Sequence, residues 1–143
     1  DHGICVICRM REQEERDRVR IVIESAHFSA FIPYAAFSPF HLWIVPRQHH
    51  SSFLNASAEE LQDLSWILHQ VLRKIYFGLN DPDFNYIIRS APENEHRPAY
   101  LHWYVSVIPR VTRTAGFELG SGMFINTTPP EDSARFLRDV IVS

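Results

Sequence analysis

The sequence predicts an α+β fold, in which an antiparallel sheet of about five strands carries one long helix and a second helix follows at the C-terminal end. Three observations support this prediction: short β-rich apolar segments joined by short loops, one long segment with a helical apolar period, and a final segment that opens on proline. The chain has 143 residues, of which 45% are hydrophobic and 22% charged. This composition is typical of a soluble globular protein, and we expect a single domain over residues 1–143.

The first strands are predicted in three apolar segments, at residues 20–25, 28–35 and 41–47. Because the loops between them are short, an antiparallel meander is the expected arrangement. The charged run at residues 11–19 precedes them, and we interpret it as a solvated turn or a short helix.

The long helix is predicted over residues 55–79. Ser57 and Glu60 have the spacing of a capping box at its start, and Gly78 lies where it ends. Its expected apolar stripe consists of Leu61, Leu64, Leu68, Val71, Leu72 and Ile75. Trp66 in this helix and Phe136 in the last one are also assigned to the core.

Two further strands are predicted at residues 85–91 and 101–109, joined by a polar loop. Residues 116–131 contain three of the five glycines and are expected to form a folded loop with a short strand. The last helix is expected to start at Pro130, since proline is favoured in the first helical turn, and to run to residue 142.

Charge and hydropathy exclude several classes of partner. The net charge is −3 and the isoelectric point is about 6.2, so we expect no nucleic acid partner. No apolar run approaches the roughly 20 residues of a membrane helix, and no signal peptide opens the sequence. We therefore expect no membrane association and a cytoplasmic location.

The two cysteines form a Cys-x-x-Cys motif at Cys5 and Cys8. With no strand upstream, this motif favours metal binding over redox chemistry. If the third and last strands are neighbours, His49 and His102 complete a Cys2His2 set, the standard ligand set of structural zinc. The alternative leaves free thiols and a loop histidine.

His102, Tyr104 and Ser106 alternate along the last strand and are expected to share one face. A catalytic interpretation makes His102 a nucleophile or base, with Tyr104 or Ser106 orienting a phosphate. In the alternative, the three are core residues with satisfied hydrogen bonds. Arg89 lies near a strand end, where it is able to hold an anion or simply be solvated.

Five segments, in order, resemble the C-terminal half of galactose-1-phosphate uridylyltransferase, an enzyme of the histidine-triad superfamily. They are "CVIC", "FIPYAAFSPFHLWIVPRQHHSSF", "YIIRSAP", "LHWYVSVIPR" and "RTAGFELGSGMFINTTPPEDSARFLR". The resemblance implies the histidine-triad (HIT-like) fold, a half-barrel antiparallel sheet that carries a long helix.

The resemblance also assigns roles to the last strand. The superfamily pattern is His-x-His-x-(His/Gln/Glu) with the middle histidine as nucleophile, and it matches His102, Tyr104 and Ser106. A phenol, with an ordinary pKa near 10, is a poor replacement for imidazole, so no catalytic residue is assigned. Some family members bind a second metal at positions that match Arg89 and Tyr104, and we expect that site to be lost.

The resemblance strengthens the zinc assignment to Cys5, Cys8, His49 and His102. In the uridylyltransferases, the loop that matches residues 113–126 reaches the active site of the neighbouring subunit and contacts the hexose phosphate. Phe117, Glu118 and Asn126 match those positions. Together with Tyr104 and Ser106 they are the expected substrate-binding residues, and a homodimer is implied.

The sequence therefore favours a zinc-stabilised module that binds a nucleotide or sugar phosphate and lacks the nucleophilic histidine. The alternative is an active nucleotidyltransferase of the UDP-hexose:hexose-1-phosphate uridylyltransferase type, or part of one. A third possibility, a small nucleotide hydrolase, requires the same absent histidine.

Overall fold

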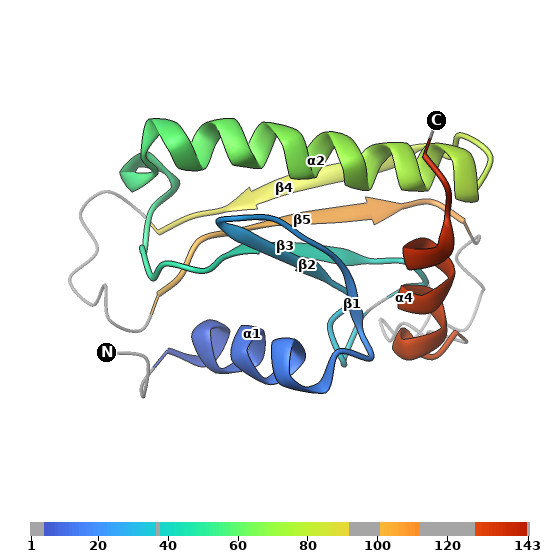
Figure 1. Cartoon of the computed structure of the whole chain (residues 1–143), viewed down its shortest axis with the longest axis horizontal. Coiled ribbons are helices and arrows are strands. Elements are labelled where there is room, and N and C mark those ends of the chain that lie inside the picture. The colour runs from blue at the N-terminus through green and yellow to red at the C-terminus, as the bar shows by residue number, and fades with distance from the viewer. Residues whose placement is uncertain (1–4, 37, 92–100, 112–127, 143) are drawn as a thin grey trace, which may run out of the picture.

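A five-stranded antiparallel sheet forms the centre of the molecule (Figure 1). The computed structural model describes residues 5–36, 38–91, 101–111 and 128–142. The strands, in the order in which they pair, are β1 (Ile21–Glu24), β2 (Phe28–Phe31), β3 (Leu42–Pro46), β5 (Tyr104–Pro109) and β4 (Phe84–Arg89). The predicted meander of the first three strands and the five-stranded sheet are both confirmed.

The long helix α2 (Ala58–Gly78) lies across one face of the sheet (Figure 1). Its predicted capping box is confirmed, since the Glu60 amide donates to Ser57 Oγ and the Ser57 amide donates to the Glu60 carboxylate, both at 3.1 Å. The residues before it form the short 3-10 helix η1 (Phe53–Asn55), so α2 begins later than predicted. None of the helices in the described ranges has the length and apolar character needed to span a bilayer.

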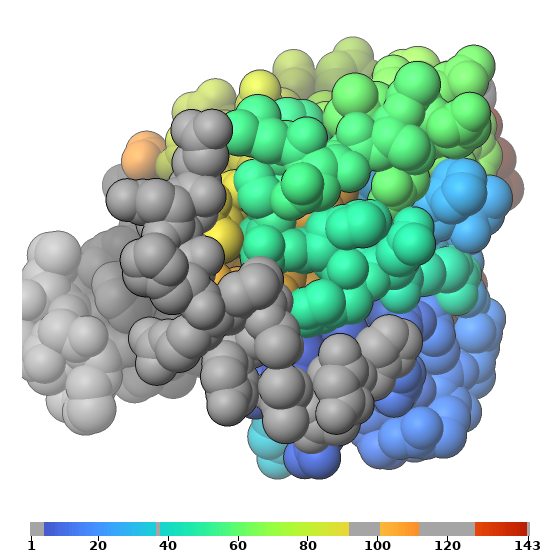
Figure 2. All heavy atoms as spheres, turned by 90° about the vertical axis from the view of Figure 1, so that its left-hand side faces the viewer, coloured from blue at the N-terminus to red at the C-terminus, as the bar shows by residue number. Residues whose placement is uncertain are grey.

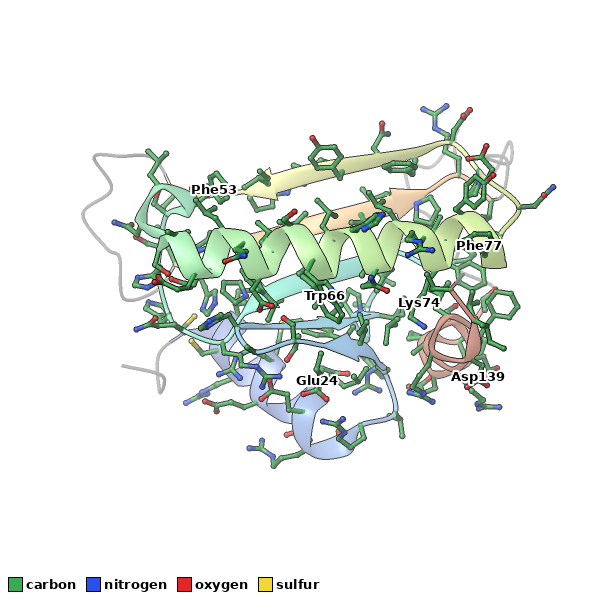
Figure 3. The ribbon with its side chains drawn as sticks, turned by 45° about the horizontal axis from the view of Figure 1, so that its top comes forward. Glu24, Phe53, Trp66, Lys74, Phe77 and Asp139 are labelled. Atoms are coloured by element: carbon green, nitrogen blue, oxygen red, sulfur yellow. The ribbon has the colours of Figure 1, made fainter. Side chains whose placement is uncertain are left out.

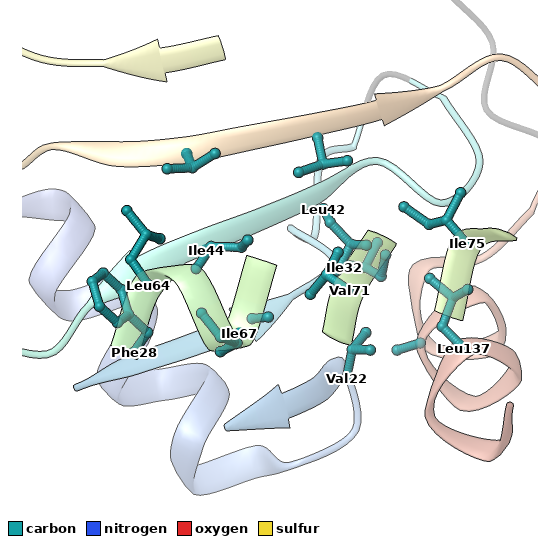
Figure 4. Packing of buried hydrophobic residues seen from close by; sticks show 14 of the residues in the cluster. Val22, Phe28, Ile32, Leu42, Ile44, Leu64, Ile67, Val71, Ile75 and Leu137 are labelled. Carbon is teal, nitrogen blue, oxygen red and sulfur yellow. The ribbon is translucent and has the colours of Figure 1, made fainter. Parts of the chain in front are cut away.

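The main core lies between α2 and the sheet (Figure 4). Residues paired across an antiparallel ladder share a face, so Ala30, Ile44 and Val105 lie on the same side of three adjacent strands. The helix contributes four buried side chains to this core, namely Leu64, Ile67, Val71 and Ile75. This burial of aliphatic surface holds the sheet and helix together.

The predicted orientation of the α2 stripe is partly wrong. Leu61 is 43% exposed and Trp66 is 48% exposed, whereas Ile67 is fully buried. Phe136 in the last helix, also predicted as core, is 46% exposed. In α2 the buried positions follow a spacing of three or four residues from Leu64, which turns Trp66 away from the sheet (Figure 3).

The charged run near the start lies in a helix that is longer than predicted, and two of its charged side chains, Arg11 and Glu14, are buried. It belongs to α1 (Val6–Asp17), a helix of 12 residues on the side of the sheet opposite α2 (Figure 1). Two ion pairs attach α1 to residues beside the sheet strands, Glu14–Arg20 at 2.7 Å and Glu15–Arg47 at 2.8 Å, and Arg47 also pairs with Glu24 of β1 at 2.9 Å. Arg47 is 32 residues from Glu15, so the local charged pattern did not show that this helix packs on the sheet.

The last helix α4 (Pro130–Asp139) starts at the predicted proline but ends before residue 142. Lys74 of α2 points toward it (Figure 3) and donates from Nζ to the carbonyls of Leu137, Arg138 and Val140 at 3.1–3.2 Å. The Val140 amide also donates to the Leu137 carbonyl at 3.2 Å, and the buried ammonium group completes the C-terminal end of α4 by binding carbonyls that a helix end leaves without i+4 partners.

Candidate functional site

The first turn of α1 brings Cys5 and Cys8 to the same side. Cys5 is the N-cap residue, and its Sγ accepts a hydrogen bond from the Cys8 amide at 3.3 Å. Both side chains are fully buried. The spacing of the motif therefore works through the geometry of a helix start, with the two sulfurs on one flank.

The end of β3 and the start of β5 bring the two histidines to these sulfurs. The strands are antiparallel neighbours, and the Trp103 amide donates to the His50 carbonyl at 3.0 Å. Nδ1 of His49 lies 3.3 Å from Cys8 Sγ, and Nδ1 of His102 lies 3.2 Å from the same sulfur. The four ligand atoms of Cys5, Cys8, His49 and His102 all lie within 4.8 Å of one another. The structure thus brings together the predicted set. Figure 2 shows this end of the molecule, where teal atoms of the region around β3 lie between α1 (blue) and α2 (green).

His102 presents a lone pair to the sulfurs. Its Nε2 lies 3.0 Å from the Pro46 carbonyl, and since a carbonyl only accepts, Nε2 carries the proton. Burial lowers the pKa of His102 to about 4, against the opposing effect of the Pro46 hydrogen bond. The ring is neutral at neutral pH, and Nδ1 is free to act as a metal ligand whose orientation is fixed by a backbone carbonyl.

The cysteine sulfurs lie in surroundings that require a cation if they are to ionise. Burial, followed by the hydrogen bond and charge of Cys5, raises the pKa of Cys8 to about 12. A bound divalent cation reverses this preference, since a coordinating thiol is deprotonated. Ligand atoms of tetrahedral zinc lie about 3.3–3.8 Å apart, given the usual Zn–S and Zn–N distances. Two cysteine sulfurs and two imidazole nitrogens within 4.8 Å of one another form a group able to hold such an ion.

Next to this cluster, Tyr104 and Ser106 lie on the sheet face opposite α2. Tyr104 pairs with Arg89 of β4, and Ser106 pairs with Trp43 of β3 and Ile87 of β4. The rings of Trp43 and Tyr104 stack with centroids 4.3 Å apart and an interplanar angle of 30°. Tyr104 and Ser106 therefore share a face as predicted, while His102 lies before the strand and belongs to the cluster.

The sequence analysis missed His41. Its Nε2 lies 2.7 Å from Ser106 Oγ, and both side chains are buried. Burial, followed by the charge of Arg89, lowers the pKa of His41 below its ordinary value. The alternation His41, Trp43, Val45 along β3 indicates their common face, but contact with Ser106 follows only from the β3–β5 register.

The other predicted substrate-binding residues, Phe117, Glu118 and Asn126, lie outside the described residues, as do the loop at 92–100 and the glycine-containing loop. Their contacts with a hexose phosphate stay a prediction.

Comparison with known proteins identifies the family. A model of the galactose-1-phosphate uridyl transferase C-terminal domain matches residues 1–135. Galactose-1-phosphate uridylyltransferase of Thermotoga maritima is 34% identical over 147 residues, which cover 96% of this chain and 45% of that protein.

Two solved structures place the fold. The crystal structure of an ADP-glucose phosphorylase from Arabidopsis thaliana with bound ADP-glucose superimposes with a TM-score of 0.85 at 36% identity, covering 98% of this chain and 44% of that one. A zinc-bound histidine triad family protein from Mycobacterium smegmatis has a TM-score of 0.66 at 19% identity, covering 98% and 94% of the two chains, which shows a common fold.

The chain spans less than half the length of the Thermotoga and Arabidopsis proteins. The match to the family model nonetheless covers nearly all of the present sequence, from its first residue to α4. The chain therefore belongs to the galactose-1-phosphate uridylyltransferase family and carries its C-terminal domain, with the fold of the histidine-triad proteins.

Proposed function

We propose that this chain is a zinc-stabilised histidine-triad-fold domain that binds a nucleotide sugar or sugar phosphate without the family's nucleophilic histidine. The observation that carries the zinc assignment is the convergence of Cys5, Cys8, His49 and His102, with ligand atoms within 4.8 Å of one another. Four protein ligands fill a tetrahedral zinc ion and leave no position for substrate. The ion is thus structural in this proposal, and it ties α1 to β3 and β5.

The ligand is proposed to occupy the face that carries Tyr104 and Ser106. The stacked pair of Trp43 and Tyr104 offers aromatic surface, and Arg89 opposite Tyr104 offers a cation for a phosphate. ADP-glucose is bound in the 36% identical Arabidopsis relative, which supports a nucleotide sugar as the ligand class. Phe117, Glu118 and Asn126 are proposed to contact its sugar.

Histidine-based nucleotidyl transfer is proposed to be absent because Tyr104 stands where the family resemblance expects the nucleophile. The competing function is an active uridylyltransferase-type enzyme, or part of one, in which another residue or another part of a longer protein supplies the nucleophile.

We also propose that two copies of the domain pair in the cytoplasm through β4. All six residues of β4 are exposed, and among the described strands β4 pairs only with β5. Large apolar side chains on this edge include Phe84, Tyr86 and Ile88, beside a hollow of about 240 Å³ between α2 and β4. An exposed apolar edge strand is suited to pairing with another strand.

The cytoplasmic location is proposed because two buried cysteine thiols in a ligand cluster suit a reducing compartment.

Three measurements on the 143-residue chain test these proposals. Elemental analysis should give one zinc per chain, and a value near zero contradicts the structural ion. Isothermal titration with ADP-glucose and UDP-glucose should show binding that Arg89→Ala weakens, while Arg73→Ala on α2 serves as the matched control. Light scattering should give a dimer that Tyr86→Arg converts to a monomer.

The role of Tyr104 is tested by mass spectrometry of the protein after incubation with either nucleotide sugar. We expect no nucleotidyl group on Tyr104 in the wild type and a nucleotidyl-histidine in Tyr104→His. A nucleotidyl group on Tyr104 itself contradicts the loss of the nucleophile and favours the enzyme.

A further inference from the structure

Helix α1 is attached to the rest of the fold through side chains that are not aliphatic. Its buried residues are Cys8, Arg11 and Glu14. By contrast, α2 buries four leucine, isoleucine and valine side chains, and α4 buries Ala134 and Leu137. Burial of aliphatic surface is the main source of packing free energy, so packing holds α1 more weakly than it holds α2 or α4.

The apolar contact between α1 and the sheet is small. Ile7 of α1 is only partly buried where it packs against the cluster of Ile21, Phe31 and Val45, and the neighbouring Val6 is 65% exposed. A helix of 12 residues is marginal in water on its own. Helix α1 therefore depends on its attachments to stay helical.

The two charge pairs of α1 add a limited amount of stability. Glu15 pairs with Arg47 at 2.8 Å in a partly exposed position, where an ion pair contributes little. Glu14 pairs with Arg20 at 2.7 Å in a largely buried position, where the cost of removing both charges from water offsets much of their attraction. These pairs alone are not expected to hold α1 on the sheet.

The Cys2His2 cluster supplies the remaining attachment. Cys5 and Cys8 lie at the start of α1, while His49 and His102 follow β3 and precede β5. Without a metal, the two pairs of ligands are joined only by contacts between sulfur and imidazole nitrogen, at 3.2–3.7 Å. Sulfur is a weak hydrogen-bond partner, so these contacts are poor substitutes for metal–ligand bonds.

We propose that α1 is a metal-held clasp, which lies on the sheet while the four ligands share an ion and separates from the sheet when the ion is removed. The sheet, α2 and α4 keep their own aliphatic core and stay folded. The proposal rests on the zinc site proposed above and adds a local movement to it. Release of α1 uncovers the small cluster against which Trp43 and Tyr104 pack, so the face proposed to bind the nucleotide sugar loses support.

Hydrogen exchange followed by mass spectrometry tests the clasp in the 143-residue chain. The zinc-loaded wild type is compared with the same protein after dipicolinate has removed the metal, and with Cys8→Ser. We expect the amides of residues 9–17 to exchange at the rate of an unprotected peptide once zinc is lost, while residues 64–75 of α2 keep their slow exchange. Val6→Ser is the matched control, since Val6 lies between the two cysteines and is exposed, and this variant should keep the zinc and the protection of the wild type.

Elemental analysis of the same samples separates the clasp from the zinc site itself. A zinc content near zero in the wild type overturns both. One zinc per chain, with unchanged exchange in residues 9–17 after its removal, overturns the clasp alone. Loss of protection in residues 64–75 at the same time also overturns the clasp, because the ion then holds the whole fold.

Titration with ADP-glucose measures the effect of the clasp on the proposed ligand face. We expect Cys8→Ser to bind roughly 10-fold more weakly than Val6→Ser, within the range of coupling between two sites of one protein. Equal affinities of the two variants overturn the link between α1 and this face. Absence of binding to the zinc-loaded wild type overturns the proposed ligand instead, and the exchange of residues 9–17 still decides the clasp.

Discussion

The side of the sheet under α2 and the side toward α1 are held by different forces. Under α2, aliphatic side chains such as Ile44, Ile67 and Val71 form a continuous core. Toward α1 the apolar cluster is smaller, consisting of Ile21, Phe31 and Val45, and ion pairs such as Glu15–Arg47 and the Cys2His2 cluster at one end accompany it. Apolar packing is non-directional, whereas charge pairs and ligand sets fix geometry.

The difference explains where the chemistry lies. The candidate ligands Cys8 and His102, and the face residues His41, Tyr104 and Ser106, all lie on the α1 side or at its end. The α2 side supplies stability by burial, which leaves the other side able to carry polar groups in fixed positions.

The largest expected effect is the loss of the cluster. Cys8→Ser should remove the bound zinc and lower the free energy of unfolding by on the order of 5 kcal/mol, since the metal-binding free energy is folding free energy. Chemical denaturation and elemental analysis measure both quantities. His50→Ala, next to a proposed ligand but outside the set, is the control and should keep its zinc. A Cys8→Ser protein as stable as the wild type shows that the α1 side does not depend on a metal.

The second effect compares two adjacent residues of α2. Ile67→Ala should cost about 2–5 kcal/mol, because it opens a cavity in the core, while Trp66→Ala should cost less than about 1 kcal/mol, because that ring is half exposed. Urea denaturation measures both. Equal losses for the two variants mean that the core is not where Figure 4 places it.

The smallest effect concerns one charge pair on the α1 side. Burial alone raises the pKa of Glu24, but hydrogen bonds from Arg18 and Arg47 hold it below its ordinary value. A carboxyl with a lowered folded-state pKa stabilises the protein above its unfolded pKa of about 4.3, and this stability is lost as the pH falls through the folded value. Glu24→Gln should therefore cost about 1 kcal/mol at pH 7 and nothing in the acid limit.

Thermal unfolding of the wild type and Glu24→Gln between pH 7 and pH 2 measures this difference. A constant difference at all pH values shows that Glu24 stabilises by packing and not by charge.

The sequence predicted those helices and strands whose signals lie within a few neighbouring residues. The capping box at Ser57 and Glu60 and the alternation in the strands predicted α2 and the sheet. Ligand chemistry, strengthened by the family resemblance, predicted the convergence of Cys5, Cys8, His49 and His102, although these residues are distant in sequence. In α2, Leu64, Val71 and Ile75 are buried as predicted, and the error is confined to Leu61 and Trp66, which face away from the sheet.

Features that depend on distant partners were not predictable in this way. Glu15 of α1 pairs with Arg47, which follows β3 and lies 32 residues away, and the local charged run does not show this partner. His41 meets Ser106 through strand register, and Lys74 closes α4 across a gap of 63 residues. The partner of each of these side chains is known only from the assembled fold.

The cluster also sets an order of events during synthesis of the chain. Cys8 and His102 are separated by 94 residues, so at the ribosome's rate of about 5–20 residues per second the first ligands wait roughly 5–20 s for the last. During that interval Cys5 and Cys8 lack one of their proposed partner ligands and are available to other metals and oxidants. For the proposed zinc ion, the complete ligand set therefore exists only after His102 has been made, late in the synthesis of this domain.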